Sequence, residues 1–276
     1  MMPGRDNKSA VMEVYEDIWA QFLQAKKYDE YIAHRCESRL PFYKAIAAKL
    51  SGQKRSQTVL ELGCGTAIDL NIIAKKNGGL SCFGSDISTK SILLSKEITK
   101  VFANHIQYFV ADTLCLPLRT GTFDFVFSQG LVEHFRDPAS VIRENARVLK
   151  RGGTLIINVP QKFTGYTLVK KWRIHRKRWH LGWETEFSYR RLKKLGERAG
   201  LREKTVFGYQ YWKSWKEPLF VLRDLYDKFH RSNPFRGKRI FLTLKQNYDA
   251  FWNHIEKKWG HHFLQNIVIV FEKQNE

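Results

Sequence analysis

The stretch Val59-Leu60-Glu61-Leu62-Gly63-Cys64-Gly65-Thr66-Ala67 decides how this chain folds. Its apolar start has the composition of a buried strand, and two glycines one residue apart follow directly. Glycine permits positive φ and lets a ligand approach the backbone, and the helix expected after Ala67 begins with unpaired N–H groups. We therefore predict a strand, a tight turn and a helix that together hold a ligand.

The residues around this turn indicate which ligand it holds. The dinucleotide-binding pattern Gly-x-Gly-x-x-Gly requires a third glycine at position 68, where this chain has Ile68. Glu61 precedes the turn, and a carboxylate there disfavours a pyrophosphate but suits the cationic sulfonium and ammonium groups of S-adenosylmethionine. The turn therefore favours S-adenosylmethionine over NAD.

Apolar segments and helical segments alternate along the chain beyond the turn. Strands are predicted at 58–62, 81–86, 106–111, 123–128, 154–159, 202–208 and 265–271. Helices are predicted at 68–76, 91–101, 138–149 and 188–199, the third closed by Lys150-Arg151-Gly152-Gly153. This alternation is typical of an α/β fold, with a mostly parallel sheet covered by helices on both faces.

We expect one domain over residues 1–276. Helical spacing of apolar residues over 9–50 predicts an N-terminal cap of two or three helices, broken near Pro41. The nucleoside-binding core is expected at 58–160. The segments 161–187 and 209–263 fit no strand of the sheet, and we interpret them as insertions on the substrate side.

Further motifs follow the glycine turn in a fixed order. Asp86 ends the second strand, Asp112 follows the third, and the segments Pro117-Leu118, 123–127 and 150–155 come after them. With the turn, they resemble the class I S-adenosylmethionine-dependent methyltransferases, in particular the small-molecule and quinone-biosynthesis branch called methyltransferase type 11. The resemblance covers roughly 58–160 and implies a seven-stranded, Rossmann-like sheet whose last strand is antiparallel.

The resemblance also implies which residues bind S-adenosylmethionine. Asp86 would accept hydrogen bonds from the ribose hydroxyls, and Asp112 would contact the adenine amino group. The implied cofactor-binding set is Glu61, Gly63, Cys64, Gly65, Asp86, Ile87, Asp112, Thr113, Ser128 and Gln129. Ala67 departs from the family, which usually has a third glycine there, and we expect a negative φ at Ala67 and a narrower turn.

The segment from Ser128 to Pro138 resembles the Glu-His-x-x-Asp-Pro segment of small-molecule methyltransferases. Methyl transfer needs a base only where the acceptor must lose a proton. We predict His134 as that base and Glu133 as its orienting partner. A structural role for His134 and a divalent-metal role for Glu133 stay open, although no metal site is predicted. An Asn/Asp-Pro-Pro-Tyr segment does not follow the fourth strand, which disfavours N-methylation of nucleic-acid bases.

The chain is strongly basic, with a formal net charge of +20. Residues 161–262 contain 25 Lys or Arg, nine Asp or Glu and seven of the eight Trp. Within them, residues 170–180 carry six Lys or Arg and two Trp, and a helix there would place Val169, Trp172 and Trp179 on one face. This pattern suits an anionic membrane surface, RNA, or a solvated rim around a pocket.

These observations together favour a methyltransferase that acts on a small or lipid-linked acceptor with an anionic part. An RNA methyltransferase and a non-catalytic binding protein on the same fold are the alternatives. A polar start at residues 1–10, no run of about 18 apolar residues and no Cys-x-x-Cys pair predict a cytoplasmic location, with peripheral membrane contact as a further expectation.

Overall fold

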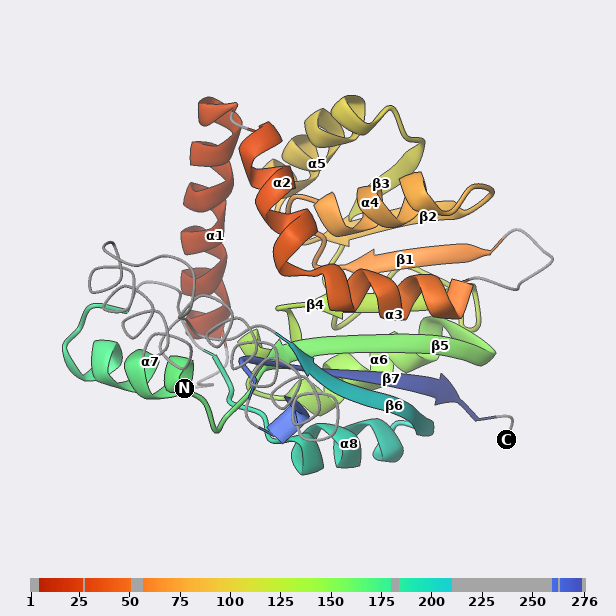
Figure 1. The fold of residues 1–276 in the computed structure, drawn as a ribbon. Helices are drawn as coiled ribbons and strands as arrows, with labels where there is room; N and C mark the ends of the chain where they lie inside the picture. Colours follow the sequence, from red (N-terminus) through yellow and green to blue (C-terminus); the bar gives the residue numbers. More distant parts are fainter. Residues whose placement is uncertain are drawn as a thin grey trace, which may run out of the picture.

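The computed structural model describes residues 5–26, 28–50, 57–179, 184–209, 260–262 and 264–274. In these residues seven strands form one sheet in the order β3-β2-β1-β4-β5-β7-β6 (Figure 1). The strands are β1 (Thr58–Leu62), β2 (Ser81–Asp86), β3 (Ile106–Val110), β4 (Phe123–Gln129), β5 (Leu149–Pro160), β6 (Leu201–Tyr209) and β7 (Asn266–Lys273).

Strands β1 to β5 run parallel to one another, whereas β7 is antiparallel to both β5 and β6. The predicted fold class, a mostly parallel sheet with an antiparallel last strand, is therefore confirmed. Because β1, β2 and β4 are parallel, their carboxyl ends meet at one edge of the sheet. The glycine turn after β1 opens at that edge.

Helices cover both faces of the sheet (Figure 1). Side chains alternate along each strand, so that Val59 packs into one apolar core and Leu60 into the other. The helices are α1 (Arg5–Ala25), α2 (Tyr28–Ser38), α3 (Leu40–Leu50), α4 (Ile68–Lys76), α5 (Thr89–Phe102), α6 (Pro138–Val148), α7 (Gly165–His175) and α8 (Tyr189–Arg198), with a short 3₁₀ helix, η1 (Val132–His134).

The N-terminal helices are α1, α2 and α3, and the break predicted near Pro41 lies at Arg39, between α2 and α3. Pro41 lies in the first turn of α3, where the absent N–H group has no helical partner to lose. Another break, between α1 and α2, lies near Lys26, whose φ is +49°. The helix α1 stands along the carboxyl edge of the sheet, beside the glycine turn (Figure 1).

The helix predicted at 138–149 is found as α6, but residues 150–153 do not close it, because they belong to β5. The helix α6 ends at Val148, and β5 begins at Leu149, which pairs with Phe123. The register then shifts, because the next pair joins Phe125 to Thr154. A Cβ atom at Gly153 would lie 2.9 Å from the carbonyl oxygen of Lys150 and 3.0 Å from that of Asp124. Gly153 is therefore required by close backbone packing inside a strand rather than by a helix terminus.

The insertion at 161–187 contains α7. Trp172 lies on this helix, but the prediction that Trp179 shares its face is wrong, because α7 ends at His175 and Lys177 has a φ of +53°. The Trp179 ring instead contacts Tyr166, with ring centroids 6.2 Å apart. Of the insertion at 209–263, all but Tyr209 and residues 260–262 lies outside the described residues. Among the helices that the structure describes, none has the length and apolar character needed to cross a bilayer.

Candidate cofactor and acceptor site

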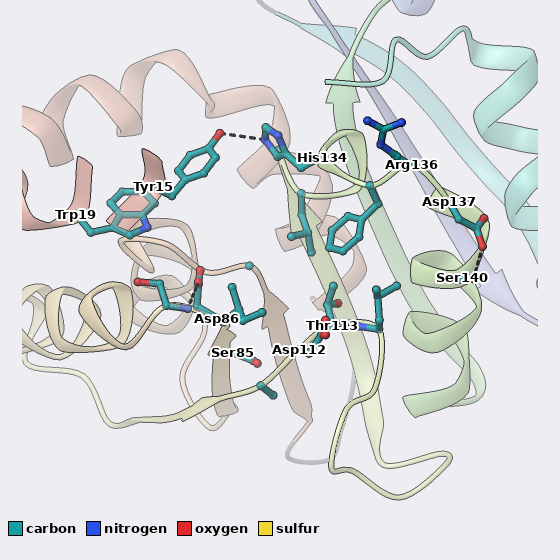
Figure 2. Close-up of a pocket in the computed structure, with 18 residues that line it drawn as sticks. Tyr15, Trp19, Ser85, Asp86, Asp112, Thr113, His134, Arg136, Asp137 and Ser140 are labelled. Atoms are coloured by element: carbon teal, nitrogen blue, oxygen red, sulfur yellow. Dashed lines mark hydrogen bonds between the residues drawn. The ribbon is translucent and has the colours of Figure 1, made fainter. Parts of the chain in front are cut away.

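A cavity of about 450 Å³ opens where the carboxyl ends of β1, β2 and β4 meet (Figure 2). The glycine turn forms its inner wall. Gly63 lines the cavity with a φ of +64°, and a Cβ atom there would lie 2.7 Å from Cδ1 of Leu131. Glycine is therefore needed at position 63 for both its conformation and its size.

Ala67 corrects one expectation about this turn. Its φ is +51°, not negative, so its backbone has the left-handed conformation that favours glycine. Gly65 has a similar φ of +55°. The backbone of the turn therefore has the conformation expected for glycine at position 67, although the residue is alanine. The narrower turn expected from a negative φ is not found.

Asp86 connects β2 to the glycine turn. Its carboxylate accepts the Gly65 N–H group at 2.9 Å and the Ser88 N–H group at 3.0 Å. Burial raises the pKa of Asp86, while these N–H groups oppose that shift. The hydroxyl of Ser91 donates to the Gly65 carbonyl oxygen at 2.8 Å. Two strand ends are thereby held in one fixed arrangement at the mouth of the cavity.

The opposite wall combines polar atoms with exposed apolar side chains. Asp112 accepts the Leu114 N–H group at 3.0 Å, and both residues line the cavity. The buried hydroxyl of Thr113 has no hydrogen-bond partner among the described residues. Ile87 and Leu114 are 38% and 39% exposed. Carboxylates beside apolar side chains fit a nucleoside, which presents hydroxyl and amino donors together with a flat apolar base.

Two aromatic residues of α1 close the cavity from outside. The Tyr15 hydroxyl lies 3.0 Å from Nε2 of His134, and the Tyr15 and Trp19 rings stack with centroids 6.0 Å apart (Figure 2). Trp19 also covers Gly65, where a Cβ atom would lie 3.1 Å from the indole. Neither residue is recognisable as part of a site from the sequence alone, because an aromatic pair at i, i+4 is also the pattern of an ordinary core-facing helix.

Only some of the predicted cofactor-binding residues line the cofactor cavity. Those that line the cavity are Gly63, Asp86, Ile87, Asp112 and Thr113. Glu61, Cys64, Gly65 and Ser128 are not among its described lining residues, and Gln129 lines a second cavity. For these residues, contact with the cofactor stays a prediction.

Glu61 lies inside the protein rather than on the cavity surface. Its side chain is buried against the α4 side of the sheet, and desolvation raises its pKa well above the ordinary range. The charge of nearby Asp69 raises that pKa further. Oε2 of Glu61 accepts no hydrogen bond from the part of the chain that the structure describes.

Glu133 and His134 are consecutive, but they line different cavities. His134 lines the cofactor cavity, whereas Glu133 lines the second cavity, of about 270 Å³, together with Gln129 and Asn158. Burial raises the pKa of Glu133 to about 8, and the charge of Glu184 adds to this shift. The predicted roles of His134 as base and Glu133 as its partner stay predictions. Within the described residues, no cluster of three or more His, Cys, Asp or Glu side chains could hold a metal ion.

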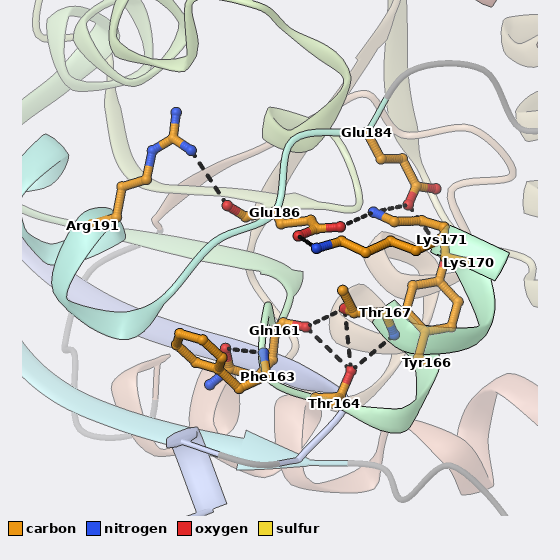
Figure 3. Close-up of polar contacts among 10 residues, drawn as sticks. All are labelled: Gln161, Phe163, Thr164, Tyr166, Thr167, Lys170, Lys171, Glu184, Glu186 and Arg191. Carbon is orange, nitrogen blue, oxygen red and sulfur yellow. Dashed lines mark hydrogen bonds and ion pairs between the residues drawn. The ribbon is translucent and has the colours of Figure 1, made fainter. Parts of the chain in front are cut away.

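A buried ion pair connects α7 to the Glu133 loop. The Lys170 ammonium lies 3.4 Å from Glu184 and 3.6 Å from Glu186, and its side chain is only 2% exposed (Figure 3). The Thr185 N–H group donates to the Glu133 carbonyl oxygen at 2.6 Å. Lys170 therefore faces the protein interior and is not part of the basic outer face predicted for residues 170–180.

Residues 60–157 match the family model described as Methyltransferase domain. This region is therefore a methyltransferase domain of the class I, S-adenosylmethionine-dependent type, and S-adenosylmethionine is the cofactor of this type of domain. The sheet order and the cavity at its carboxyl edge agree with this assignment.

Two curated relatives and one solved structure illustrate the similarity. Ajmaline N-methyltransferase of Rauvolfia serpentina is 25% identical over 55% of this chain and 58% of its own length. The 2-methyl-6-phytyl-1,4-hydroquinone methyltransferase of Synechocystis sp. is 31% identical over 44% of this chain and 38% of its own length. A geranyl diphosphate methyltransferase solved with S-adenosylmethionine is 16% identical, with a TM-score of 0.56, over 87% of this chain and 86% of the other. The chain thus spans little more than half, or less, of these curated relatives.

Proposed function

We propose that this protein transfers a methyl group from S-adenosylmethionine to a small or lipid-linked acceptor that carries an anionic part. The observation that supports methyl transfer is the cofactor cavity. It brings the glycine turn, Asp86 and Asp112 to one edge of the sheet, at the positions that the family resemblance assigns to the nucleoside.

Different residues of this cavity would contact different parts of the cofactor. Asp86 would accept the ribose hydroxyls, Asp112 and Thr113 would face the base, and Ile87 and Leu114 would flank it. S-adenosylmethionine supplies an electrophilic methyl group there. Tyr15 and Trp19 cover the cavity, which excludes water from the place where the acceptor must approach.

The outer face of α7 supports an acceptor or surface that is both apolar and anionic. Leu168 is 71% exposed and Trp172 is 52% exposed, four residues apart on one side of the helix. Lys171 and Arg173 are exposed beside them. An apolar strip flanked by cations suits a headgroup region of a membrane better than it suits solvent alone.

The names of the relatives leave the acceptor open. One relative is named for an amine acceptor and the other for a hydroquinone. The proposal about the acceptor therefore depends on the charge and the exposed side chains of this chain.

A label-transfer experiment tests the proposed class. The protein is incubated with methyl-labelled S-adenosylmethionine and separate lipid, small-molecule, RNA and protein fractions of a cell extract. We expect label in the lipid or small-molecule fraction. Label confined to RNA would overturn the proposed acceptor class and favour the RNA alternative, and no transfer to any fraction would favour the non-catalytic one.

Vesicle flotation tests the surface contact separately. We expect the protein to float with anionic vesicles and not with neutral ones, and to lose flotation at raised salt. Replacement of both Leu168 and Trp172 by Ala should abolish flotation, whereas Leu93→Ala, at a 50% exposed position on α5, should not. Equal flotation with neutral vesicles would contradict an electrostatic contact.

A further inference from the structure

A second cavity adjoins the cofactor cavity, and Gly130 lines both. One wall comes from the carboxyl ends of β4 and β5 and from η1, through Gln129, Asn158 and Glu133. Its volume of about 270 Å³ is at the lower end of the range for small-molecule sites, roughly 300–1,000 Å³. It can therefore hold the reacting end of a substrate rather than the whole molecule.

Three unpaired acceptor oxygens lie in this wall. Oε1 of Gln129, Oε2 of Glu133 and Oδ1 of Asn158 are buried, and none accepts a hydrogen bond from a residue that the structure describes. The Glu133 and Asn158 side chains are each only 3% exposed. Buried polar groups are normally paired, so three unpaired acceptors that line one cavity indicate a ligand that donates hydrogen bonds.

Tyr209 fixes the direction of the two amides. The side-chain nitrogens of Gln129 and Asn158 donate to the Tyr209 hydroxyl oxygen at 3.1 Å and 2.7 Å. Because both nitrogens are held by the same oxygen, the carbonyl oxygens of the two amides are left as the available groups. The wall is therefore preorganised to accept hydrogen bonds rather than to donate them.

Another wall carries positive charge. Arg35 and Arg39 line the cavity, and both pair with the single carboxylate of Asp69, Arg35 at 3.9 Å. One carboxylate cannot neutralise two guanidinium groups. Burial raises the pKa of Glu133, the acid in the lining of this cavity, to about 8, so below that pH one of the two guanidinium charges is available to an anionic group of a ligand.

We infer that the second cavity is the acceptor subsite, where a hydroxyl or amine nucleophile donates hydrogen bonds to Gln129, Glu133 and Asn158 while a neighbouring anionic group faces Arg35 and Arg39. This inference depends on the proposed function. Gly130, common to both cavities, places the nucleophile next to the methyl donor. His134 lines the cofactor cavity and is not among the described lining residues of the second one.

Glu133 is the proton acceptor in this arrangement. The nucleophile's oxygen or nitrogen forms a bond to the methyl carbon, the electron pair of the broken carbon–sulfur bond stays with sulfur, and the proton passes from the nucleophile to the Glu133 carboxylate. Burial raises the pKa of Glu133 to about 8, so its affinity for a proton is matched to neutral conditions.

Ligand-observed NMR tests the subsite without turnover. The full chain, saturated with S-adenosylhomocysteine, is titrated with phenol and with benzylamine as donor probes and with anisole as a ring that has no donor. The same titrations use Asn158→Leu and the near-isosteric Gln129→Met. Asn145→Leu is the matched control, because Asn145 is also fully buried with an unpaired amide, on α6 outside this cavity.

We expect phenol or benzylamine to bind about three- to tenfold more tightly than anisole, a difference of the size that one hydrogen bond supplies. Both cavity variants should remove this preference and the control variant should keep it. In Asn158→Leu and Asn145→Leu the S-adenosylhomocysteine affinity should change less than about twofold. Equal binding of anisole, or an unchanged preference in both cavity variants, would overturn the subsite. If calorimetry showed no S-adenosylhomocysteine binding to the unmodified protein, the proposed function itself would fail.

Discussion

The Tyr15 hydroxyl lies 3.0 Å from Nε2 of His134, although 119 residues separate the two along the chain. This contact joins the N-terminal cap to the loop after β4 across the mouth of the cofactor cavity. Burial raises the pKa of Tyr15, so its hydroxyl stays protonated and can donate a hydrogen bond to an imidazole nitrogen. The cap is thus a part of the site and not only a cover for the sheet.

Tyr15→Phe should weaken cofactor binding without unfolding the protein. The substitution removes one hydrogen bond, a net contribution of about 0.5–1.5 kcal/mol, and keeps the ring that stacks on Trp19. We expect the Kd for S-adenosylhomocysteine, measured by calorimetry, to rise by about two- to tenfold. Tyr28→Phe, at the start of α2, is the control and should leave the Kd unchanged. An unchanged Kd in Tyr15→Phe would show that the contact is incidental.

Gly63→Ala should destabilise the protein and abolish cofactor binding. Gly63 has a φ of +64° and no room for a Cβ atom beside Leu131. Gly79→Ala is the matched control, because Gly79 has a φ of +80° but nothing within 4 Å of an added Cβ. A left-handed alanine costs about 1–2 kcal/mol, so chemical denaturation should show that loss in Gly79→Ala and a clearly larger one in Gly63→Ala. Equal losses would mean that Leu131 moves aside at no cost.

Lys170→Met and Lys171→Met should differ sharply although the two residues are adjacent. Lys170 is 2% exposed between Glu184 and Glu186, and its loss leaves a buried carboxylate unpaired, at a cost of about 3–5 kcal/mol. Lys171 is 58% exposed and pairs with Glu186 at the surface, where an ion pair contributes less than about 1 kcal/mol. Denaturation midpoints measure the difference. Similar midpoints would contradict the buried ion pair of Figure 3.

The free energy of unfolding should depend on pH through the titration of Glu133. Its pKa in the folded protein, about 8, lies above the ordinary value of 4.5, so the folded state binds more protons than the unfolded state between these values. The contribution of Glu133 to stability is therefore fully present below about pH 4.5 and is lost as pH rises through 8, by about 1.4 kcal/mol per pH unit. The charged and titratable groups around it include Glu184, Lys170, Tyr15, Tyr166, Tyr209, His34, Arg35 and Arg39.

Glu133→Gln isolates this effect from other buried acids. Its free energy of unfolding, measured from pH 5 to 8, should fall less steeply than that of the unmodified protein, and the difference between the two curves should grow with pH. The same substitution should remove any rise of kcat/KM through about pH 8, whereas His134→Asn should keep that rise. Parallel stability curves would contradict a raised pKa, and loss of the rise only in His134→Asn would assign the base to His134.

Much of the fold could be predicted from the sequence because its strands are short, apolar and bounded by turn residues. The bounds of β1, β2 and α4 agree with the prediction, since each begins or ends at a clear change from polar to apolar residues. The start of β5 was mispredicted because Gly152-Gly153 is typical of a helix end, and only the packing against Asp124 shows why a strand needs glycine there.

The candidate site was predictable where it depends on residues close in sequence. Asp86 and Asp112 lie at strand ends, and parallel strands bring such ends together, so their meeting in one cavity follows from the pattern. Long-range contacts such as Tyr15 with His134, or Tyr209 with Asn158, carry no local signal. The burial of Lys170 could not be predicted from the sequence either, because a lysine in a basic run is normally solvated.

The central claim is that the cavity beside the glycine turn holds S-adenosylmethionine through Asp86, and calorimetric titration of S-adenosylhomocysteine tests it most directly. We expect one binding site per chain, no binding of NADH, and an affinity about ten- to a hundredfold lower in Asp86→Asn, since a carboxylate that accepts hydrogen bonds contributes about 1.5–3 kcal/mol. Circular dichroism and the melting temperature should confirm that the variant stays folded. Tight binding of NADH, or equal affinity in a folded Asp86→Asn variant, would contradict the assignment.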